Sequence, residues 1–342
     1  MQTLRLDAAR LPDFIARLMA WGAVWAPVET AAGTFTLQII EDVFEARPDV
    51  LRTVVPFKKL LLPPSFAMLK GGFGDVAGVD PGSGDDDHEL CIFYGAHACD
   101  VHALKILDLL YLSNHVDPYY AAKRDKLVVV AFGCWPDEKC FCDSLGTSTA
   151  DDGFDIALTP LDGRLLATVA TSRGDDIVRA SADLFAAATP DDILAYLTRL
   201  SERRAAFQLQ LDVTDLPYVL ELKKHDPVWD ELARKCVCCG SCSIVCPTCS
   251  CFNVADWIEE DGTASRMRTW DSCLYRDYAL VAGGHNFRAD RGDRVRNRYY
   301  HKQEAFVREF GMPSCVGCGR CIENCPTGIH VVEVFQHVRG EL

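Results

Sequence analysis

Residues 236–247 decide how this chain is interpreted: they read Cys236-Val-Cys-Cys239-Gly-Ser-Cys242-Ser-Ile-Val-Cys246-Pro247. A second run repeats the spacing as Cys315-Val-Gly-Cys318-Gly-Arg-Cys321-Ile-Glu-Asn-Cys325-Pro326. Both fit the pattern C-x2-C-x2-C-x3-C-P, which wraps a cubane [4Fe–4S] cluster. Zinc sites usually pair C-x2-C with a distant second pair instead. The spacing therefore favours two iron–sulfur clusters over zinc knuckles or a disulfide framework, and it predicts a protein that moves electrons.

The ligands of the two clusters are predicted to cross between the runs. In two-cluster ferredoxins the first three cysteines of a run bind one cluster, and the fourth binds the other. The crossed pattern assigns Cys236, Cys239, Cys242 and Cys325 to the first cluster (site 1). It assigns Cys315, Cys318, Cys321 and Cys246 to the second (site 2).

A third group of cysteines lies in the N-terminal part of the chain. Predicted strands at 90–94 and 127–132 flank a predicted helix at 101–112, which is typical of a parallel βαβ crossover. Cys99 and Cys134 follow the two strands, and the carboxyl ends of parallel strands meet at one edge of the sheet. With Cys140 and Cys142 in the next loop, this edge is predicted to hold a third [4Fe–4S] cluster (site 3: Cys99, Cys134, Cys140 and Cys142). A four-cysteine zinc site or unrelated thiols are the alternatives.

Five of the 17 cysteines stay outside these sites. Cys91 lies inside a predicted strand and is expected to act as a small buried hydrophobic residue. The other four, which are Cys238, Cys249, Cys251 and Cys273, are expected to pack near site 1, with a fourth metal site as the alternative.

Length and charge restrict the class of protein. With 342 residues the chain can form two domains, and its net charge of −14 disfavours binding to nucleic acid or anionic membranes. The N-terminus lacks a secretory signal pattern, and no apolar run is long enough to span a bilayer. Reduced thiols that bind metal indicate a reducing cytoplasm.

The expected fold class is α+β. Residues 1–225 are predicted to form an α/β domain that carries site 3 on its parallel βαβ unit, with Asp100 as N-cap of the helix. Residues 226–342 are predicted to form a helical ferredoxin domain with two [4Fe–4S] clusters, and the long segment between Cys246 and Cys315 is expected to add helices. The glycine-rich stretch 71–88 is predicted to be a loop, and its nominal dinucleotide pattern is rejected because no helix follows.

One basic segment interrupts the acidic composition. It contains Arg288, Arg291, Arg294, Arg296, Arg298 and Lys302. A solvated helix or loop is the ordinary interpretation. The functional interpretations are a docking strip for an acidic redox partner, or positive charge that raises the potential of a nearby cluster.

Several motifs together resemble the beta subunit of cytosolic sulfhydrogenases, which are soluble [NiFe]-hydrogenases. They are similar also to the electron-transfer subunit of anaerobic sulfite reductase. The resemblance rests on Phe57-Lys58-Lys59 with Pro63, Tyr94-Gly-Ala-His-Ala-Cys99-Asp100, Asp117-Pro-Tyr-Tyr120, Cys140-Phe-Cys142, Cys246-Pro-Thr-Cys249, Trp270-Asp-Ser-Cys273, Gly283-Gly-His-Asn-Phe-Arg288 and the run from Cys315 to Cys321.

The resemblance implies a subunit without catalytic residues of its own. It implies a relay between a subunit that binds flavin and handles NAD(P)H and a catalytic [NiFe]-hydrogenase pair. A sirohaem sulfite reductase as the catalytic partner is the first alternative. The second is that a cluster at site 3 itself reduces a substrate; in either case the cofactors are three [4Fe–4S] clusters.

Overall fold

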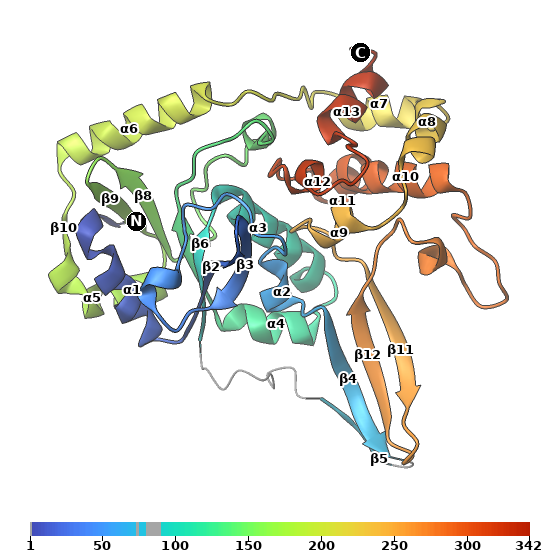
Figure 1. Cartoon of the computed structure of the whole chain (residues 1–342), viewed down its shortest axis with the longest axis horizontal. Coiled ribbons are helices and arrows are strands. Elements are labelled where there is room, and N and C mark those ends of the chain that lie inside the picture. The colour runs from blue at the N-terminus through green and yellow to red at the C-terminus, as the bar shows by residue number, and fades with distance from the viewer. Residues whose placement is uncertain (1, 73–74, 80–89) are drawn as a thin grey trace.

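The computed structural model describes residues 2–72, 75–79 and 90–342. Its body is built on an eight-stranded mixed sheet with the order β10-β1-β9-β8-β7-β6-β2-β3 (Figure 1). In that order the strands span Phe185–Ala187, Gln2–Asp7, Arg164–Val169, Ile156–Leu161, Leu127–Phe132, Cys91–Ala96, Ala23–Ala31 and Thr34–Ile39.

The middle of this sheet is parallel and its edges are antiparallel. β6 pairs in parallel with both β2 and β7, and β7 pairs in parallel with β8. The helix α3 (Ala98–Leu112) connects β6 to β7, so the predicted βαβ crossover is confirmed. β8 and β9 form a hairpin that turns at Asp162-Gly163.

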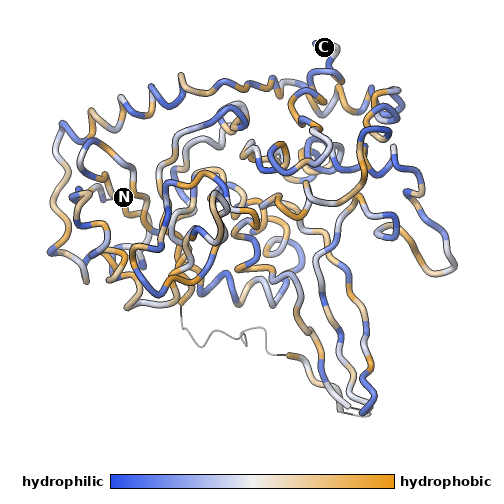
Figure 2. Tube along the Cα trace, in the orientation of Figure 1, coloured by the Kyte–Doolittle hydropathy of each residue, from blue (hydrophilic) through white to orange (hydrophobic). Residues whose placement is uncertain are grey.

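Both faces of the sheet are covered. In β7, Leu127, Val129 and Ala131 belong to the core shared with α3, together with α2 (Lys58–Leu61) and α4 (Pro118–Asp125). The alternate residues of β7 face the core shared with α1 (Leu11–Met19) and α5 (Ser172–Ala180). A strand buried on both faces is apolar at every position, which explains the sequence of β7. Figure 2 shows hydrophobic segments gathered at the centre of the body.

The N-terminus of α3 differs from the prediction. The N-cap is His97, and Asp100 occupies the third helical position, where its carboxylate accepts the backbone N–H of His97 at 3.2 Å. The imidazole of His97 lies 2.9 Å from the carbonyl oxygens of Phe132 and Val50. These tertiary contacts fix His97 at the cap, and they are not visible in the local sequence.

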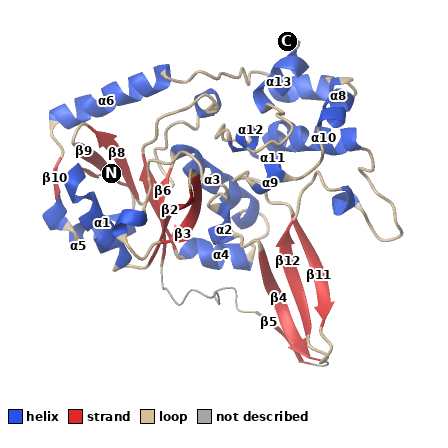
Figure 3. Cartoon of the chain, viewed as in Figure 1, coloured by secondary structure: helices blue, strands red, loops and turns tan. Residues whose placement is uncertain are grey.

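A second sheet stands away from the body as an arm made of β11, β12, β4 and β5 in that order (Figures 1 and 3). Its strands span Phe252–Ile258, Ala264–Trp270, Ser65–Gly72 and Asp75–Gly78. Two predictions are therefore partly wrong. Residues 71–72 and 75–78 are strands, whereas residues 73–74 and 80–89 of the predicted loop lie outside the described residues. The segment between Cys246 and Cys315 carries a hairpin as well as helices, because β12 finds its partner β4 almost 200 positions earlier in the chain.

Helices dominate the rest of the C-terminal half. They are α7 (Leu216–Leu222), α8 (Val228–Lys235), α9 (Ser241–Ile244), α10 (Arg291–Tyr300), the π-helix η6 (His301–Ala305), α11 (Phe306–Phe310), α12 (Arg320–Glu323) and α13 (Val331–Arg339). The long helix α6 (Pro190–Ala205) and an extended segment lead into this region from the sheet (Figure 1). One-turn helices lie at 8–10, 43–45, 142–145, 182–184 and 276–279.

The division at residues 225 and 226 stays a prediction. The arm contains β4 and β5 from one side of that boundary and β11 and β12 from the other. In the part of the chain that the structure describes, no helix has the length and apolarity to cross a membrane.

Candidate iron–sulfur centres

The two C-terminal sites are neighbouring cavities walled by thiols. One cavity, which we equate with site 1, is lined by Cys236, Cys239, Cys242 and Cys325. The other, which we equate with site 2, is lined by Cys246, Cys315, Cys318 and Cys321. Each cavity thus combines three cysteines of one run with the fourth cysteine of the other run, as the crossed pattern predicts. Cys321 lines both cavities, so the two sites are adjacent.

The donors around site 2 fit a bound cluster. The Nε and Nη1 atoms of Arg320 and the Nε2 atom of Gln303 are buried without a hydrogen-bond partner among the described residues. Both side chains line the site 2 cavity. Unpartnered buried donors are costly, and cluster sulfur atoms are the acceptors that such donors require. The residues present therefore suit an anionic iron–sulfur group.

Three of the six basic residues in this segment are buried, so its interpretation as a solvated helix is wrong for these three. Arg294, Arg298 and Lys302 recur every four residues along α10 and η6, and each is less than a tenth exposed. Arg298 donates from Nε to Sγ of Cys242 at 3.1 Å and lines both cavities. Its guanidinium thus lies between site 1 and site 2.

Lys302 lines the site 2 cavity. Its Nζ donates to Oγ1 of Thr248 at 2.7 Å and to the carbonyl of Ser314 at 3.1 Å. Burial acts to lower the pKa of Lys302. The negative charge of Cys246 and Cys249 raises it by a larger amount, so the pKa of Lys302 lies above its ordinary value. The amine therefore stays charged beside the ligands of site 2.

Three of the thiols of sites 1 and 2 are poor acids in the protein without metal. Burial raises the pKa of Cys315 to about 11 and that of Cys321 to about 12. At site 1 burial raises the pKa of Cys236 to about 11. Because only thiolates bind metal, assembly of a cluster at these positions must release protons.

Site 3 lies at the carboxyl edge of the parallel strands, as the sequence predicts. Cys134 follows β7, Cys99 begins α3, and Cys140 and Cys142 lie in the next loop. The thiol of Cys142 is within electrostatic reach of those of Cys134 and Cys140, and it contributes to the raised pKa of Cys99, for which burial is the main cause. The four thiols therefore lie within electrostatic reach of one another and of the site 2 thiol of Cys318, and no cavity among the described residues is lined by all four.

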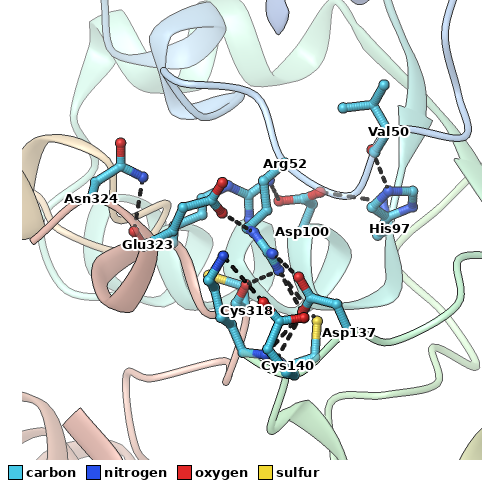
Figure 4. Close-up of polar contacts among 12 residues, drawn as sticks. Val50, Arg52, His97, Asp100, Asp137, Cys140, Cys318, Glu323 and Asn324 are labelled. Atoms are coloured by element: carbon cyan, nitrogen blue, oxygen red, sulfur yellow. Dashed lines mark hydrogen bonds and ion pairs between the residues drawn. The ribbon is translucent and has the colours of Figure 1, made fainter. Parts of the chain in front are cut away.

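Arginine side chains hold the site 3 loop. Arg203 from α6 donates from Nη2 to Sγ of Cys134 at 3.3 Å and from Nε to its carbonyl at 2.8 Å. Arg52 donates from Nη1 to Sγ of Cys140 at 3.4 Å and forms a two-pronged ion pair with Asp137 (Figure 4). Burial acts to raise the pKa of Asp137, yet the hydrogen bond from Arg52 helps to lower it to about 2. Sequence analysis missed both arginines.

Sites 2 and 3 meet backbone to backbone. A Cβ atom added at Gly317 would lie 2.6 Å from the Cα of Cys142, and one at Gly319 would lie 2.6 Å from the carbonyl oxygen of Lys139. The N–H of Phe141 donates to the carbonyl of Gly317 at 2.9 Å, and Phe141 itself lines the site 2 cavity. Arg52 adds a contact from Nη1 to the carbonyl of Cys318 at 3.4 Å. The ligand loops of the two sites are therefore in direct contact.

The remaining cysteines lie against the ligands or in the core. A hydrogen bond from Cys249 lowers the pKa of Cys246, and a hydrogen bond from Cys273 lowers the pKa of Cys251 to about 6. The N–H of Cys238 lies 3.3 Å from Sγ of Cys236. Cys238, Cys251 and Cys273 belong to the same hydrophobic core as Cys236 and Cys242, in agreement with the expected packing near site 1. Cys249 differs from the expectation, because its hydrogen bond to Cys246 places it beside site 2.

A single metal ion needs donors that converge on one point. Among residues 2–72, 75–79 and 90–342, no three His, Cys, Asp or Glu side chains are placed to hold one ion. A cubane cluster requires something else, namely one thiolate for each of four irons around a central volume.

Comparisons with known proteins agree with this arrangement. Residues 235–329 match a family described as a 4Fe-4S dicluster domain, a range that contains all eight cysteines of sites 1 and 2. Over 342 residues the chain is 41% identical to Sulfhydrogenase 2 subunit beta of Pyrococcus furiosus, and the match covers 100% of both chains. No solved structure matches the chain.

Proposed function

This chain belongs to the family of sulfhydrogenase beta subunits, and from that premise we propose that it is the electron-relay subunit of a hydrogenase complex. A [4Fe–4S] cluster, when bound, gains and loses one electron at a time. The proposal assigns three such clusters to the chain, at sites 1, 2 and 3. The single observation that carries it is the crossed sharing of Cys246 and Cys325 between two adjacent thiol-lined cavities.

The order of the sites supports a linear relay. Phe141 and Gly317 join site 3 to site 2, and Arg298 and Tyr299 line both site 2 and site 1. Site 2 is therefore the middle position. We propose the order site 3, site 2, site 1 for the relay, without a direct contact between its two ends.

Each site is supplied with at least one buried cation by this chain. Arg203 and Arg52 hydrogen-bond thiols of site 3, Arg298 does so at site 1, and Lys302 lies beside site 2. Hydrogen bonds to the sulfur ligands and nearby positive charge favour the reduced, more negative form of a cluster. These residues are proposed to set the reduction potentials.

The proposed partners follow from the family. They are a flavin subunit that exchanges electrons with NAD(P)H and a catalytic [NiFe] pair, in a cytoplasmic complex. The resemblance to anaerobic sulfite reductase keeps a sirohaem partner as the alternative. Subunits encoded beside this chain would decide between the two.

One observation favours a second candidate function at site 3. Cys134 borders a cavity of about 370 Å³ that is also lined by Arg199, Arg203 and Tyr196. A small molecule that enters this cavity would approach the third cluster directly. Turnover of an added substrate by the isolated chain would support this candidate and count against a pure relay.

Metal content tests the main proposal. Chain purified without oxygen should contain about twelve irons, which corresponds to three four-iron clusters. A content near eight irons with one zinc would contradict the third cluster and favour a zinc site at Cys99, Cys134, Cys140 and Cys142.

A further inference from the structure

One of the cysteines assigned to site 1 differs from the rest of the described cysteines in its exposure. Cys239 is exposed, whereas the others are buried or half-buried. Because site 1 is one end of the proposed relay, Cys239 marks a point where this end reaches the surface. Electron transfer weakens steeply with distance, so a partner gains most by covering this point.

Apolar side chains surround Cys239. Val237 is 58% exposed and Tyr275 is 38% exposed. Val237 and Pro326 both line the site 1 cavity, and the ring of Tyr275 packs so closely on Gly240 that a Cβ atom there would lie 2.6 Å from it. These residues, Val237, Cys239, Tyr275 and Pro326, form what we call the exit face. Exposed apolar patches with polar rims are typical of protein interfaces.

The loop after Tyr275 also exposes apolar side chains. It carries Leu280, Val281 and Phe287, the last of which is 69% exposed. The loop is folded back on itself, because the N–H of Phe287 donates to the carbonyl of Ala279 at 3.2 Å. It therefore presents these side chains from an ordered turn.

The rim of the exit face carries positive charge in a chain whose net charge is −14. Lys235 donates from Nζ to the carbonyl of Gly328 at 3.1 Å, in the turn that follows Cys325. Arg276 and Asp277 are both exposed directly after Tyr275, so Lys235 supplies the net positive charge of this rim. A partner with an acidic rim would be attracted to this edge and repelled by most of the remaining surface.

We infer that the exit face is the docking surface for a protein that carries its own redox centre, with an apolar contact area and an acidic rim. The inference rests on the proposed function and adds the place and chemistry of one partner. A small soluble electron carrier would not require a broad apolar surface, whereas a protein that stays associated gains stability by covering it.

The test uses the complex purified without oxygen from the organism's own cells through a tag on this chain. Val237→Glu places a charge in the middle of the exit face. It should lower the recovery of a cofactor-bearing partner by on the order of tenfold or more. The control is Phe44→Glu, which alters an apolar residue that is even more exposed (78%) on the other half of the chain and should leave recovery unchanged. Iron content and the low-temperature spectrum of the clusters are measured for both variants.

A second measurement covers the case in which Val237→Glu does not fold. A photo-crosslinking residue is placed at position 237 or at position 44, and the crosslinked proteins are identified by mass spectrometry and assayed for flavin and metal. A crosslink from position 237 to a protein that contains a redox cofactor supports the inference. An intact complex that crosslinks only from position 44, or normal recovery with Val237→Glu, overturns it. Neither result changes the iron count, so failure of the docking inference is distinguishable from failure of the proposed function.

Discussion

At Cys239 the proposed relay reaches the surface beneath exposed apolar side chains, whereas at Cys134 it borders a cavity lined by arginine, tyrosine and hydroxyl side chains. The first end is an exposed face, and the second is a partly open cavity between α6 and the sheet, where apolar side chains such as Phe132, Phe154 and Leu158 lie beside the polar ones. An exposed apolar face suits a protein surface, whereas a partly open cavity that combines apolar walls with a few polar groups suits a small ligand or an inserted loop. The proposed relay can therefore discriminate between partners by the surface at each end, even though all three proposed centres are [4Fe–4S] clusters.

The largest expected effect comes from breaking the crossed ligation. Cys325→Ala should damage the cluster at site 1 and convert it to a three-iron form, because a cube that loses one thiolate tends to lose the iron it held. Site 2 should keep its spectrum, since Cys246 still completes it. Electron paramagnetic resonance distinguishes the three-iron and four-iron forms.

Cys246→Ala is the mirror-image control and should damage only site 2. If each substitution instead degrades the site nearest in sequence, the two sites are independent, and the proposed order of the relay is wrong.

The next largest effect is expected at the backbone contact between the loops of sites 3 and 2. Gly317 has a φ of 62° and touches the Cys142 backbone, so Gly317→Ala combines backbone strain with a steric clash. It should destabilise the protein by about 2 kcal/mol or more and lower the iron content of site 3. Thermal unfolding and iron analysis measure the two quantities.

Gly328→Ala is a matched control, because Gly328 has a φ of 64° but no atom within 4 Å of the added Cβ. The Gly328→Ala variant should lose only the stability that backbone strain costs, and it should keep the iron content of site 3. Equal damage from both variants would mean that the close contact at Gly317 is unimportant.

A smaller effect is expected from the shared cation. Arg298→Gln removes positive charge between sites 1 and 2, so it should shift the reduction potentials of both clusters downward and leave site 3 unchanged. Arg294→Gln removes an equally buried charge one turn earlier, where the guanidinium contacts the carbonyls of Leu274 and Ala289. A redox titration that shows the same shifts in both variants would refute a specific role for Arg298.

The smallest effects are expected at the Cys134 end. Arg203→Gln should lower only the potential of site 3, because Arg203 contacts the thiol of Cys134. Arg199→Gln should leave all potentials unchanged, since Arg199 lies over the ring of Trp135 and no contact with a site 3 thiol is described for it. A shift caused by Arg199→Gln would show that the cavity and site 3 are electrostatically connected.

Much of the candidate site could be predicted because its spacing rules are local. The two cysteine runs specify their own loops. The strand–helix–strand pattern of β6, α3 and β7 places Cys99 and Cys134 at one edge of a sheet. The dicluster match and the full-length relative confirm the family. Iron binding by the individual cysteines stays a prediction.

The buried cations could not be predicted in the same way. Arg298 and Lys302 look in the sequence like part of an exposed basic segment, and Arg203 looks like an ordinary polar residue near the end of a helix. Their roles arise only when distant segments pack together: Arg203 lies 69 positions from Cys134, and Arg298 lies 56 positions from Cys242. The arm was missed for the same reason, because β4 and β12 contribute their pairing partners from opposite halves of the chain.

The arm also has a consequence for biosynthesis. β4 leaves the ribosome long before β12, the strand that pairs with it along Ser65–Gly71. During translation, one edge of β4 therefore stays open until residues 264–270 have emerged. The second cysteine run, residues 315–325, emerges later still. The proposed crossed ligation at sites 1 and 2 is thus a late event in the life of the chain, and an open strand edge before that point is a target for aggregation or for a chaperone.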